Sequence, residues 1–504
     1  MKKILINYNP WETRVAIIRS NKLENLFLGQ ATDTELERSF FKGKVLKVLP
    51  GIQTAFVDIG QHKAGFLHIS EIDHDLAMGT DGTEVLSEFD EDSQIKSKSL
   101  VEKANIAKIL HEGEELLVQV SKEPVDEKGA KLKTCFTLPG RFVVLTPNVP
   151  RIGVSKKIED KSERVRLKDI LLRHLPQGMG AVIRTNAEHK TEEEMQKDLS
   201  FLISDWHEIL NNYAKSSAKT KLYEDVDISL QVVRDHLDSE IDEIITDSPS
   251  NQKAIYSYLS KVAPEFKYKV KLFSENTGLF ERYEIDRQVT RALEKKVMLK
   301  SGGSIIIEMT EALTVIDVNT GKFIGKGNLE ETILKTNMEA ALEIVLQLKL
   351  RNIGGLIVID FIDMNNAKNR FKLVSYFEQT LKELDKFQSV VLQVSEFGIV
   401  QMTRKRSGKP LMRLLTDLCH CCQGLGRISA VRAETYEILR KVTLLLQQKP
   451  IGKNYFFEVN SAVFEFLSRS EFNSILAIEQ RFNSVLTLVS IDKIHRHDFR
   501  LKEK

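Results

Sequence analysis

Two stretches, GGSIIIEMTEALTVIDVN at residues 302–319 and GLIVIDF at residues 355–361, decide the fold of this chain. The first contains two apolar runs joined by a short polar turn, which predicts a β-hairpin. The second is a continuous apolar run, which is typical of a strand buried on both faces. Between them, LEETILKTNMEAALEIVLQLKLR at residues 329–351 repeats apolar residues at helical spacing. A strand, a helical crossover and a buried strand together predict an α/β layer.

Outside this layer the pattern of the sequence changes. Residues 1–30 are predicted to form a hairpin with Asn9-Pro10 in its turn. From about residue 41, short alternating segments separated by glycines predict a small β-barrel. The acidic stretch at 71–92 is expected to be a mobile loop of this barrel. A helix is expected at about 367–386, a strand at 390–396, and a small terminal domain at 428–504.

The bulk composition excludes several classes of protein. The 504 residues allow several domains, and a net charge of +2 argues neither for nor against nucleic acid. Four cysteines are too few for a disulfide framework, and no run approaches the ~18 apolar residues of a membrane span. The sequence has neither an HExxH motif nor a P-loop. We therefore expect a cytoplasmic protein without a membrane span.

The clearest chemical signal is a set of carboxylates at predicted strand ends. Asp317 and Asp360 each end an apolar run, with Asn319 and Asp363 close behind them. Open α/β sheets bind ligands at the carboxyl ends of their strands, and two carboxylates there repel unless a cation or proton lies between them. Mg²⁺ suits this pair because it takes one or two carboxylates plus water and substrate phosphates. The alternative is that these aspartates only cap strands or, for Asp363, the next helix.

A second signal is the turn Cys419-His420-Cys421-Cys422-Gln423-Gly424-Leu425-Gly426. Its Cys-x-x-Cys pair is half of a structural zinc site, and tetrahedral zinc needs four ligands. The remaining cysteine, Cys135, stands alone in the sequence. Either His420 and Cys421 complete the site, or a second copy of the chain supplies another pair and the zinc links a dimer. Reduced surface cysteines or a redox pair are the alternative.

Several residues suit an RNA ligand. The candidates in the expected barrel are Phe56 and Phe66 for base stacking, and Lys42, Lys44, Lys47 and Lys128 for phosphates. Arg184 and Thr185 end a predicted strand, where a guanidinium and a hydroxyl suit a terminal phosphate. A basic cluster at 404–413 precedes the cysteines and can attract backbone phosphates. For each of these residues, a core position or a solvated face is the alternative.

Taken together, these motifs resemble the catalytic half of the ribonuclease E/G family. The matching stretches are GGSIIIEMTEALTVIDVNTG, NLEETILKTNMEAALEIVLQLKLRNIGGLIVIDFIDM, the Cys-x-x-Cys-x-Gly-x-Gly turn, KGKVLKVLPGIQTAFVDIGQHKAGFLHISEI, EKGAKLKT and LPGRFVVLTPN. A chain that stops near residue 504 favours the short ribonuclease G type. There are three departures: His420 replaces the usual proline, the acidic loop is longer, and a family arginine is replaced around 386–388.

The resemblance implies a multidomain α/β fold. Its parts are an RNase H-like subdomain in two pieces (1–38 and 231–292), an embedded OB-fold RNA-binding barrel (39–134), a 5′-sensor region (135–230), a DNase I-like catalytic domain (293–414), a zinc link (415–427) and a small dimerising C-terminal α+β domain (428–504).

The resemblance also implies roles for individual residues. Asp317 and Asp360 would hold Mg²⁺, with Asn319 as a third catalytic residue that supports the scissile phosphate. Cys419 and Cys422 would share Zn²⁺ with a second protomer in a homodimer, or in a dimer of dimers. The implied RNA contacts are Phe56, Phe66 and Lys128, and the implied pocket for a 5′-monophosphate consists of Gly140, Val144, Arg184 and Thr185.

The function expected from residues and resemblance together is endoribonucleolytic. The expected reaction is Mg²⁺-dependent hydrolysis of single-stranded RNA, leaving 5′-phosphate and 3′-hydroxyl ends and stimulated by a 5′-monophosphate. The expected roles are processing of ribosomal and transfer RNA precursors and decay of messenger RNA. The main competing hypothesis is a non-catalytic RNA-binding or ribosome-assembly protein, and a weaker one is a cysteine-based redox protein.

Overall fold

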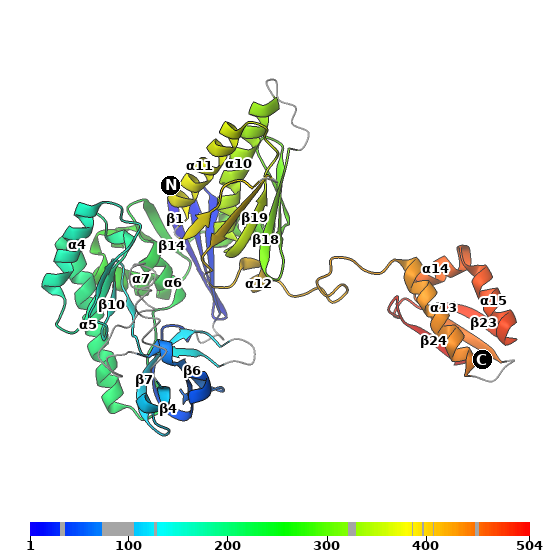
Figure 1. Ribbon diagram of the computed structural model, residues 1–504, viewed down its shortest axis with the longest axis horizontal. Coiled ribbons are helices and arrows are strands. Elements are labelled where there is room, and N and C mark those ends of the chain that lie inside the picture. Colours follow the sequence, from blue (N-terminus) through cyan, green and yellow to red (C-terminus); the bar gives the residue numbers. More distant parts are fainter. Residues whose placement is uncertain are drawn as a thin grey trace. The chain divides into compact units, whose positions relative to one another are not determined.

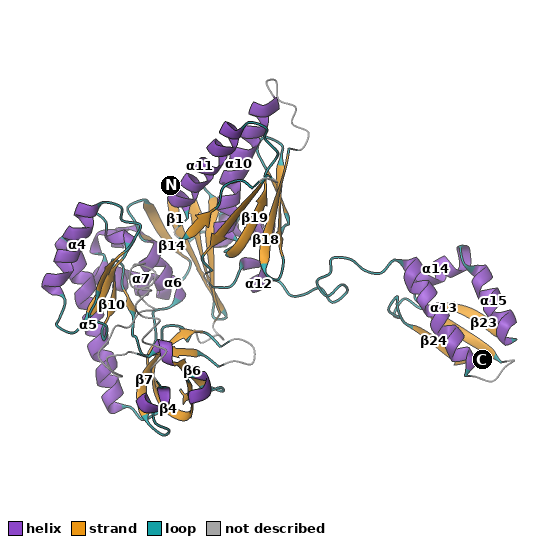
Figure 2. Ribbon diagram, in the orientation of Figure 1, coloured by secondary structure: helices purple, strands orange, loops and turns teal. Residues whose placement is uncertain are grey.

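The computed structural model describes residues 1–30, 36–72, 105–124, 129–320, 329–385, 387–395, 398–406, 408–448 and 453–504. The chain forms two compact units, Met1–Met412 and Arg413–Lys504. Both units combine helices with strands (Figures 1 and 2). Lys128 and most of the predicted acidic loop, from residue 73 onward, lie outside the described residues.

The first sheet joins the start of the chain to a segment far along the sequence. Its strands are β1 (Lys2–Tyr8), β2 (Glu12–Arg19), β3 (Lys22–Gln30), β14 (Ile241–Thr246) and β15 (Val270–Leu272), in the order β15-β14-β1-β2-β3. The predicted N-terminal hairpin is confirmed, because β1 and β2 pair antiparallel. Ile4 packs on one face beneath α6 (Ile228–His236) and α7 (Pro249–Val262), and Leu5 packs on the other beneath α8 (Leu279–Arg282) and α9 (Ile285–Leu293).

The predicted barrel is present and closed. Its strands are β4 (Phe40–Leu49), β5 (Thr54–Asp58), β6 (Gly65–His68), β7 (Glu115–Lys122) and β8 (Lys131–Lys133), which pair in the cycle β4-β5-β6-β8-β7-β4. Alternate residues such as Ala55, Val57 and Leu67 are buried inside it. The residues between them therefore face outward, as the two-residue repeat of a strand requires. A short helix, α3 (Ile106–Ile109), packs against the barrel core.

A third sheet follows the barrel. Its order is β11 (Ile152–Val154), β12 (Gly180–Ile183), β10 (Val143–Thr146) and β9 (Leu138–Pro139). Helices α4 (Lys161–His174) and α5 (Glu192–Lys215) pack on it and share its hydrophobic core. The next strand, β13 (Thr220–Tyr223), returns to pair with β4 of the barrel.

The fourth sheet contains the two stretches that decide the fold. Its order is β16 (Lys296–Met298), β17 (Ser304–Met309), β18 (Leu313–Asn319), β19 (Gly355–Asp360), β21 (Ile399–Arg404) and β20 (Ser389–Val391). The predicted hairpin is β17–β18, and the predicted crossover helix is α10 (Leu329–Leu350), after which β19 pairs parallel to β18. Together with α11 (Ala367–Leu384), α10 covers one face of this sheet (Figure 1).

The second unit is a small α+β domain with its own core. Its sheet has the order β23 (Val485–Ser490), β22 (Asn454–Val459) and β24 (Phe499–Glu503), and its helices are α13 (Val431–Gln447), α14 (Ser461–Arg469) and α15 (Phe472–Phe482). A short helix, α12 (Leu411–Leu415), spans the division between the units. No helix in the described part of the chain is long and apolar enough to cross a membrane.

Candidate active site and RNA contacts

The two predicted magnesium ligands are direct neighbours across two strands. Asp317 of β18 and Asp360 of β19 are register partners in the parallel pair. Asp360 is the last residue of its strand, as predicted, whereas β18 continues past Asp317 to Asn319. Nδ2 of Asn319 donates a hydrogen bond to Oδ2 of Asp317 at 2.8 Å. The structure therefore brings together all three predicted catalytic residues.

These side chains belong to the face of the sheet that the helices leave uncovered. Ile316 and Ile359 precede the two aspartates, and both are buried beneath α10 and α11. Successive side chains of a strand alternate between faces. Asp317 is half-buried, and Asp360 and Asn319 are exposed. A long flexible ligand such as a polynucleotide can therefore lie across this face without opening the core.

The charges at this edge of the sheet repel one another. Burial raises the pKa of Asp360, and the negative charges of Asp317 and Asp363 raise it further. A cation between the carboxylates would relieve this repulsion, and Mg²⁺ prefers such oxygen ligands. Among the described residues no three acidic, histidine or cysteine side chains are grouped closely enough to hold a metal ion alone. The pair fits Mg²⁺ only as a partial ligand set that water and substrate phosphate complete.

The predicted stacking residues lie side by side on the outside of the barrel. Phe56 of β5 and Phe66 of β6 are register partners, and both are half-buried. Lys47 pairs with Phe56 from one side, and Lys131 pairs with Phe66 from the other. Lys47 and the two rings thus form a row across three strands, whereas the ammonium of Lys131 is ion-paired with the buried carboxylate of Glu71. Aromatic faces beside a cation suit single-stranded nucleic acid.

The structure corrects two of the sequence-based candidates for phosphate binding. Nζ of Lys42 points toward the C-terminal end of α5, where it donates to the carbonyl oxygen of Ser216 at 3.0 Å. Arg404, from the basic cluster at 404–413, is fully buried in an ion pair with Asp385. Neither side chain is available to a phosphate. The spacing of basic residues along the chain did not distinguish these two cations, which bind other protein groups, from cations that are exposed.

The four residues predicted to bind a 5′-monophosphate belong to the third sheet. Gly140 follows β9, Val144 lies in β10, and Arg184 and Thr185 follow β12. Nη1 of Arg184 donates to the carbonyl oxygen of Gly140 at 2.6 Å. Oγ1 of Thr185 lies 3.1 Å from Oγ of Ser155, within hydrogen-bonding distance. A guanidinium and a hydroxyl therefore meet at one end of the sheet.

Gly140 has a packing reason to be glycine. A Cβ atom at this position would lie 2.6 Å from Oδ2 of Asp198. The buried Asp198 carboxylate accepts hydrogen bonds from the backbone N–H groups of Arg141, Phe142 and Val143 at 3.0, 2.8 and 3.1 Å. Asp198 therefore fixes the loop that presents the Gly140 carbonyl to Arg184.

Comparison with known proteins identifies the family of this chain. A sequence model of the ribonuclease E/G family matches residues 137–407. The chain is 35% identical to ribonuclease G of Salmonella typhimurium and 36% identical to ribonuclease G of Escherichia coli K12, over 95% of this chain and 94% of each relative. It is 32% identical to ribonuclease E of Escherichia coli K12, over 100% of this chain and 46% of that protein. The chain belongs to the ribonuclease E/G family.

Within this ribonuclease E/G chain, the cysteine turn lies in the second unit. Cys419 is exposed and Cys422 half-buried. The backbone N–H groups of Cys422 and Cys421 donate to the Cys419 sulfur and lower the pKa of that thiol. Leu425 N–H donates to the Cys422 carbonyl at 2.8 Å, and Gly424 and Gly426 adopt positive φ angles of 90° and 68° that suit glycine. Cys421, which is also exposed, lies in the same turn, so both the ligand set and the sharing of zinc between protomers stay predictions.

One partner of Arg184 was not indicated by the sequence. Asp235, on α6, accepts a hydrogen bond from Nη1 of Arg184 at 2.7 Å. Burial raises the pKa of Asp235, but the charges of Arg184 and Arg234 outweigh it and bring the pKa to about 2. No local motif marks Asp235, because its role depends on packing between α6 and the third sheet.

Proposed function

We propose that this protein, an endoribonuclease by its family, hydrolyses phosphodiester bonds in single-stranded RNA with Mg²⁺ held by Asp317 and Asp360. The observation that carries the proposal is the register pairing of these carboxylates on the uncovered face of the sheet. Bound Mg²⁺ supplies positive charge at the phosphate and acidifies a coordinated water. The proposed products have 5′-phosphate and 3′-hydroxyl ends.

The residues of this chain orient the substrate in the proposed reaction. Asp317 is held in place by its hydrogen bond from Asn319, which leaves the second N–H of that amide directed away from the pair. That N–H can donate to a phosphate oxygen. The Phe56–Phe66 pair and the neighbouring Lys47 are proposed to hold the strand through its bases and backbone. Lys128 is proposed as a further RNA contact from the resemblance alone.

The end of the third sheet is proposed to bind a 5′-monophosphate. Nη1 of Arg184 is occupied by Gly140 and Asp235, so the guanidinium is fixed in orientation. No hydrogen bond joins its Nε or Nη2 to the described residues, and Thr185 offers an adjacent hydroxyl. A terminal phosphate dianion would match this fork and hydroxyl. RNA with such an end is therefore the proposed preferred substrate.

Assembly and biological role are proposed from the same resemblance. Cys419 and Cys422 would each give one sulfur to a zinc shared with a second copy of the chain, forming a homodimer or a dimer of dimers. A reduced cysteine turn requires a reducing compartment, which supports the cytoplasm as the proposed location. The proposed substrates are precursors of ribosomal and transfer RNA, and messenger RNA.

The direct test uses a short A/U-rich single-stranded RNA with a 5′-monophosphate. Wild-type protein with Mg²⁺ is expected to cut it internally, and chelator is expected to stop cleavage. Asp317→Asn and Asp360→Asn should each lower the cleavage rate by about 10³-fold or more while RNA affinity changes little. Glu311→Gln, which changes an exposed carboxylate in the β17–β18 turn, is the matched control. RNA that is bound but never cut would instead support a non-catalytic RNA-binding protein.

A further inference from the structure

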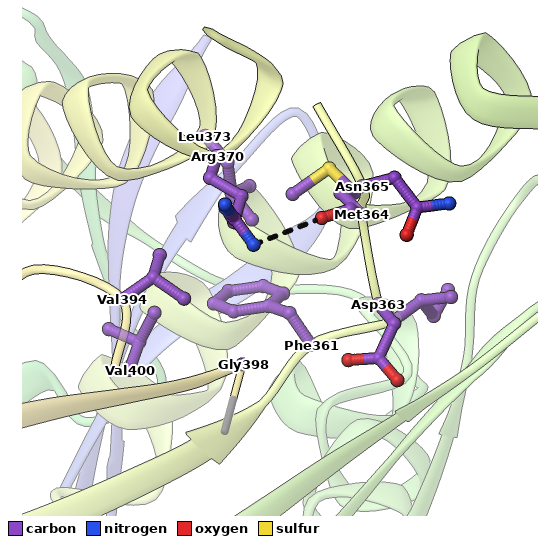
Figure 3. Close-up of a pocket in the computed structure, with 10 residues that line it drawn as sticks. Phe361, Asp363, Met364, Asn365, Arg370, Leu373, Val394, Gly398 and Val400 are labelled. Carbon is purple, nitrogen blue, oxygen red and sulfur yellow. Dashed lines mark hydrogen bonds between the residues drawn. The ribbon is translucent and has the colours of Figure 1, made fainter. Parts of the chain in front are cut away.

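A pocket of about 320 Å³ is lined in part by the segment that directly follows Asp360, from Phe361 to Asn365 (Figure 3). It is bounded by the segment that follows β19, by the first turns of α11 and by the strand β21 with the residues before it. Ligand pockets in proteins usually start at about 300 Å³. This volume suits a small planar heterocycle and is too small for a folded partner or a helix.

The described part of the pocket has an apolar floor. Phe361, Leu373 and Val400 line it and are 4%, 1% and 1% exposed. The Phe361 ring packs edge-on against Phe377, with the ring centroids 6.2 Å apart, which fixes its orientation. A rigid ring and branched aliphatic side chains form a surface on which the flat face of an aromatic ligand can pack.

The rim of the pocket is polar. Asp363, Asn365 and Arg370 line it, and all three are exposed. Nη1 of Arg370 donates one long hydrogen bond of 3.4 Å to the carbonyl oxygen of Met364, as Figure 3 shows. The rim thus offers a carboxylate acceptor, an amide that both donates and accepts, and a guanidinium plane. The Asp363 carboxylate on this rim disfavours a phosphate group in the pocket.

The glycine at position 398 leaves room for the Asp363 carboxylate. Gly398 has a φ angle of +79°, and a Cβ atom there would lie 2.8 Å from Oδ1 of Asp363. Any other residue at 398 would therefore be strained and would displace the carboxylate. Glycine keeps the Asp363 side of the pocket open, next to the segment that carries Asp360.

We propose that this pocket binds one nucleobase of the RNA strand, from a nucleotide adjacent to the phosphodiester bond that is cut. The inference rests on the proposed function and adds a determinant of sequence preference. Phe361 directly follows Asp360 in the chain but points to the opposite, helix-covered face, whereas the rim residue Asp363 lies three positions beyond Asp360 at the end of β19. A base in the pocket would therefore approach the paired aspartates around this end of the strand. Unpaired bases are recognised by stacking on aromatic and guanidinium planes and by hydrogen bonds to their edges. Phe361, Arg370 and the Asp363–Asn365 rim provide each of these contacts.

The test scans a single abasic nucleotide through the positions flanking the cleavage site. With the wild-type protein, an abasic site at one position is expected to raise KM about 10-fold, in line with the loss of one stacked base. Val394→Trp, which fills the pocket, and Arg370→Ala, at an exposed rim position, should raise KM for the intact RNA by a similar factor. In both variants the abasic site at that position should then have no further effect. Lys372→Ala, an exposed cation on the same helix outside the pocket, is the control.

The outcomes separate this inference from the proposed function. If the variants remain as sensitive as wild type to the abasic nucleotide at every position, the base lies elsewhere and the pocket proposal is wrong. If wild type is insensitive at all positions, the proposal is also wrong. If wild type cuts no RNA at all, the proposed function itself fails. Arg370→Ala keeps the test decisive if the larger Val394→Trp side chain prevents folding.

Discussion

Asp235 and Arg184 are joined by a 2.7 Å hydrogen bond although they lie 51 positions apart in the chain. The same Nη1 atom also donates to the carbonyl oxygen of Gly140 at 2.6 Å. Two acceptors from different parts of the fold therefore hold one edge of the guanidinium. Asp235 acts as a positioning residue for the proposed 5′-phosphate site.

Asp235→Ala is expected to reduce the preference for 5′-monophosphorylated RNA by about 10-fold. Without this hydrogen bond the Arg184 side chain is less ordered, so it loses more conformational entropy when it binds phosphate. The measurement is the ratio of kcat/KM for two RNAs that differ only in a 5′-phosphate or 5′-hydroxyl. Asp235→Asn keeps a hydrogen-bond acceptor and should restore part of the ratio. Asp169→Asn, at an exposed position on α4, should leave it unchanged. Equal losses for both RNAs would show that Asp235 is merely structural.

A buried ion pair stabilises the sheet that carries the aspartates. Nε of Arg404 donates to Oδ2 of Asp385 at 2.6 Å and Nη2 donates to Oδ1 at 3.1 Å, with side-chain exposures of 0% and 2%. Asp385→Ala leaves the guanidinium buried without its partner, which typically costs about 3–5 kcal/mol. Amide hydrogen exchange of β19 and β21 should speed up accordingly. Glu308→Ala, which removes the exposed Lys295–Glu308 pair of the same sheet, should cost no more than about 1 kcal/mol. Equal effects of the two substitutions would contradict this account.

Asp205 should make stability depend on pH. Burial raises its pKa to about 6, although the Tyr223 hydroxyl donates to its carboxylate at 3.4 Å. Between pH ~4 and ~6 the folded state holds a proton that the unfolded state has lost, so stability falls as pH rises through this window. Above it, Asp205→Asn should be more stable than wild type by on the order of 1 kcal/mol, after allowance for solvent screening of a half-buried group.

The check is the melting temperature of wild type and Asp205→Asn between pH 4 and pH 8. The melting temperatures of the two proteins should be equal at pH 4 and should differ increasingly toward neutral pH. Glu193→Gln, an exposed carboxylate on the same helix, should follow wild type throughout. A constant difference between wild type and Asp205→Asn across this range would mean that Asp205 does not titrate there.

The elements around the paired aspartates were predictable from sequence because their signals are local. The β17–β18 hairpin, α10 and β19 each follow from one uninterrupted periodic stretch. When a single helix connects two parallel strands, few topologies are possible, and β19 is expected beside β18. The pairing of Asp317 with Asp360 then follows from the register of these two strands. The barrel was predictable as a class of fold. Its closure was not, because β4 and β7 pair although the acidic stretch separates them in the sequence.

What the sequence did not reveal depends on long-range packing. The neighbour of β1 across the first sheet is β14, and nothing local indicates that pairing. Of the strand predicted at 390–396, the structure forms β20, Ser389–Val391, and the backbone N–H of Leu392 still donates to the Gln401 carbonyl of β21 at 2.8 Å, while residue 396 lies outside the described residues. The pocket beside Asp363 combines side chains from three separate segments, so spacing could not predict it. The domain boundaries, the metals and the dimer stay predictions.

Replacing both Cys419 and Cys422 with serine is expected to remove bound zinc and weaken the dimer. Serine cannot supply the thiolate ligands that structural zinc requires, and the proposed site takes only these two from each protomer. Zinc content by atomic emission and mass by sedimentation equilibrium measure the two effects on the same preparation. Cys421→Ser is the informative control: if Cys421 is not a ligand, both zinc and the dimer persist. Loss of zinc from Cys421→Ser would place that residue in the ligand set, whereas an unchanged dimer after complete loss of zinc would exclude the metal as the link between protomers.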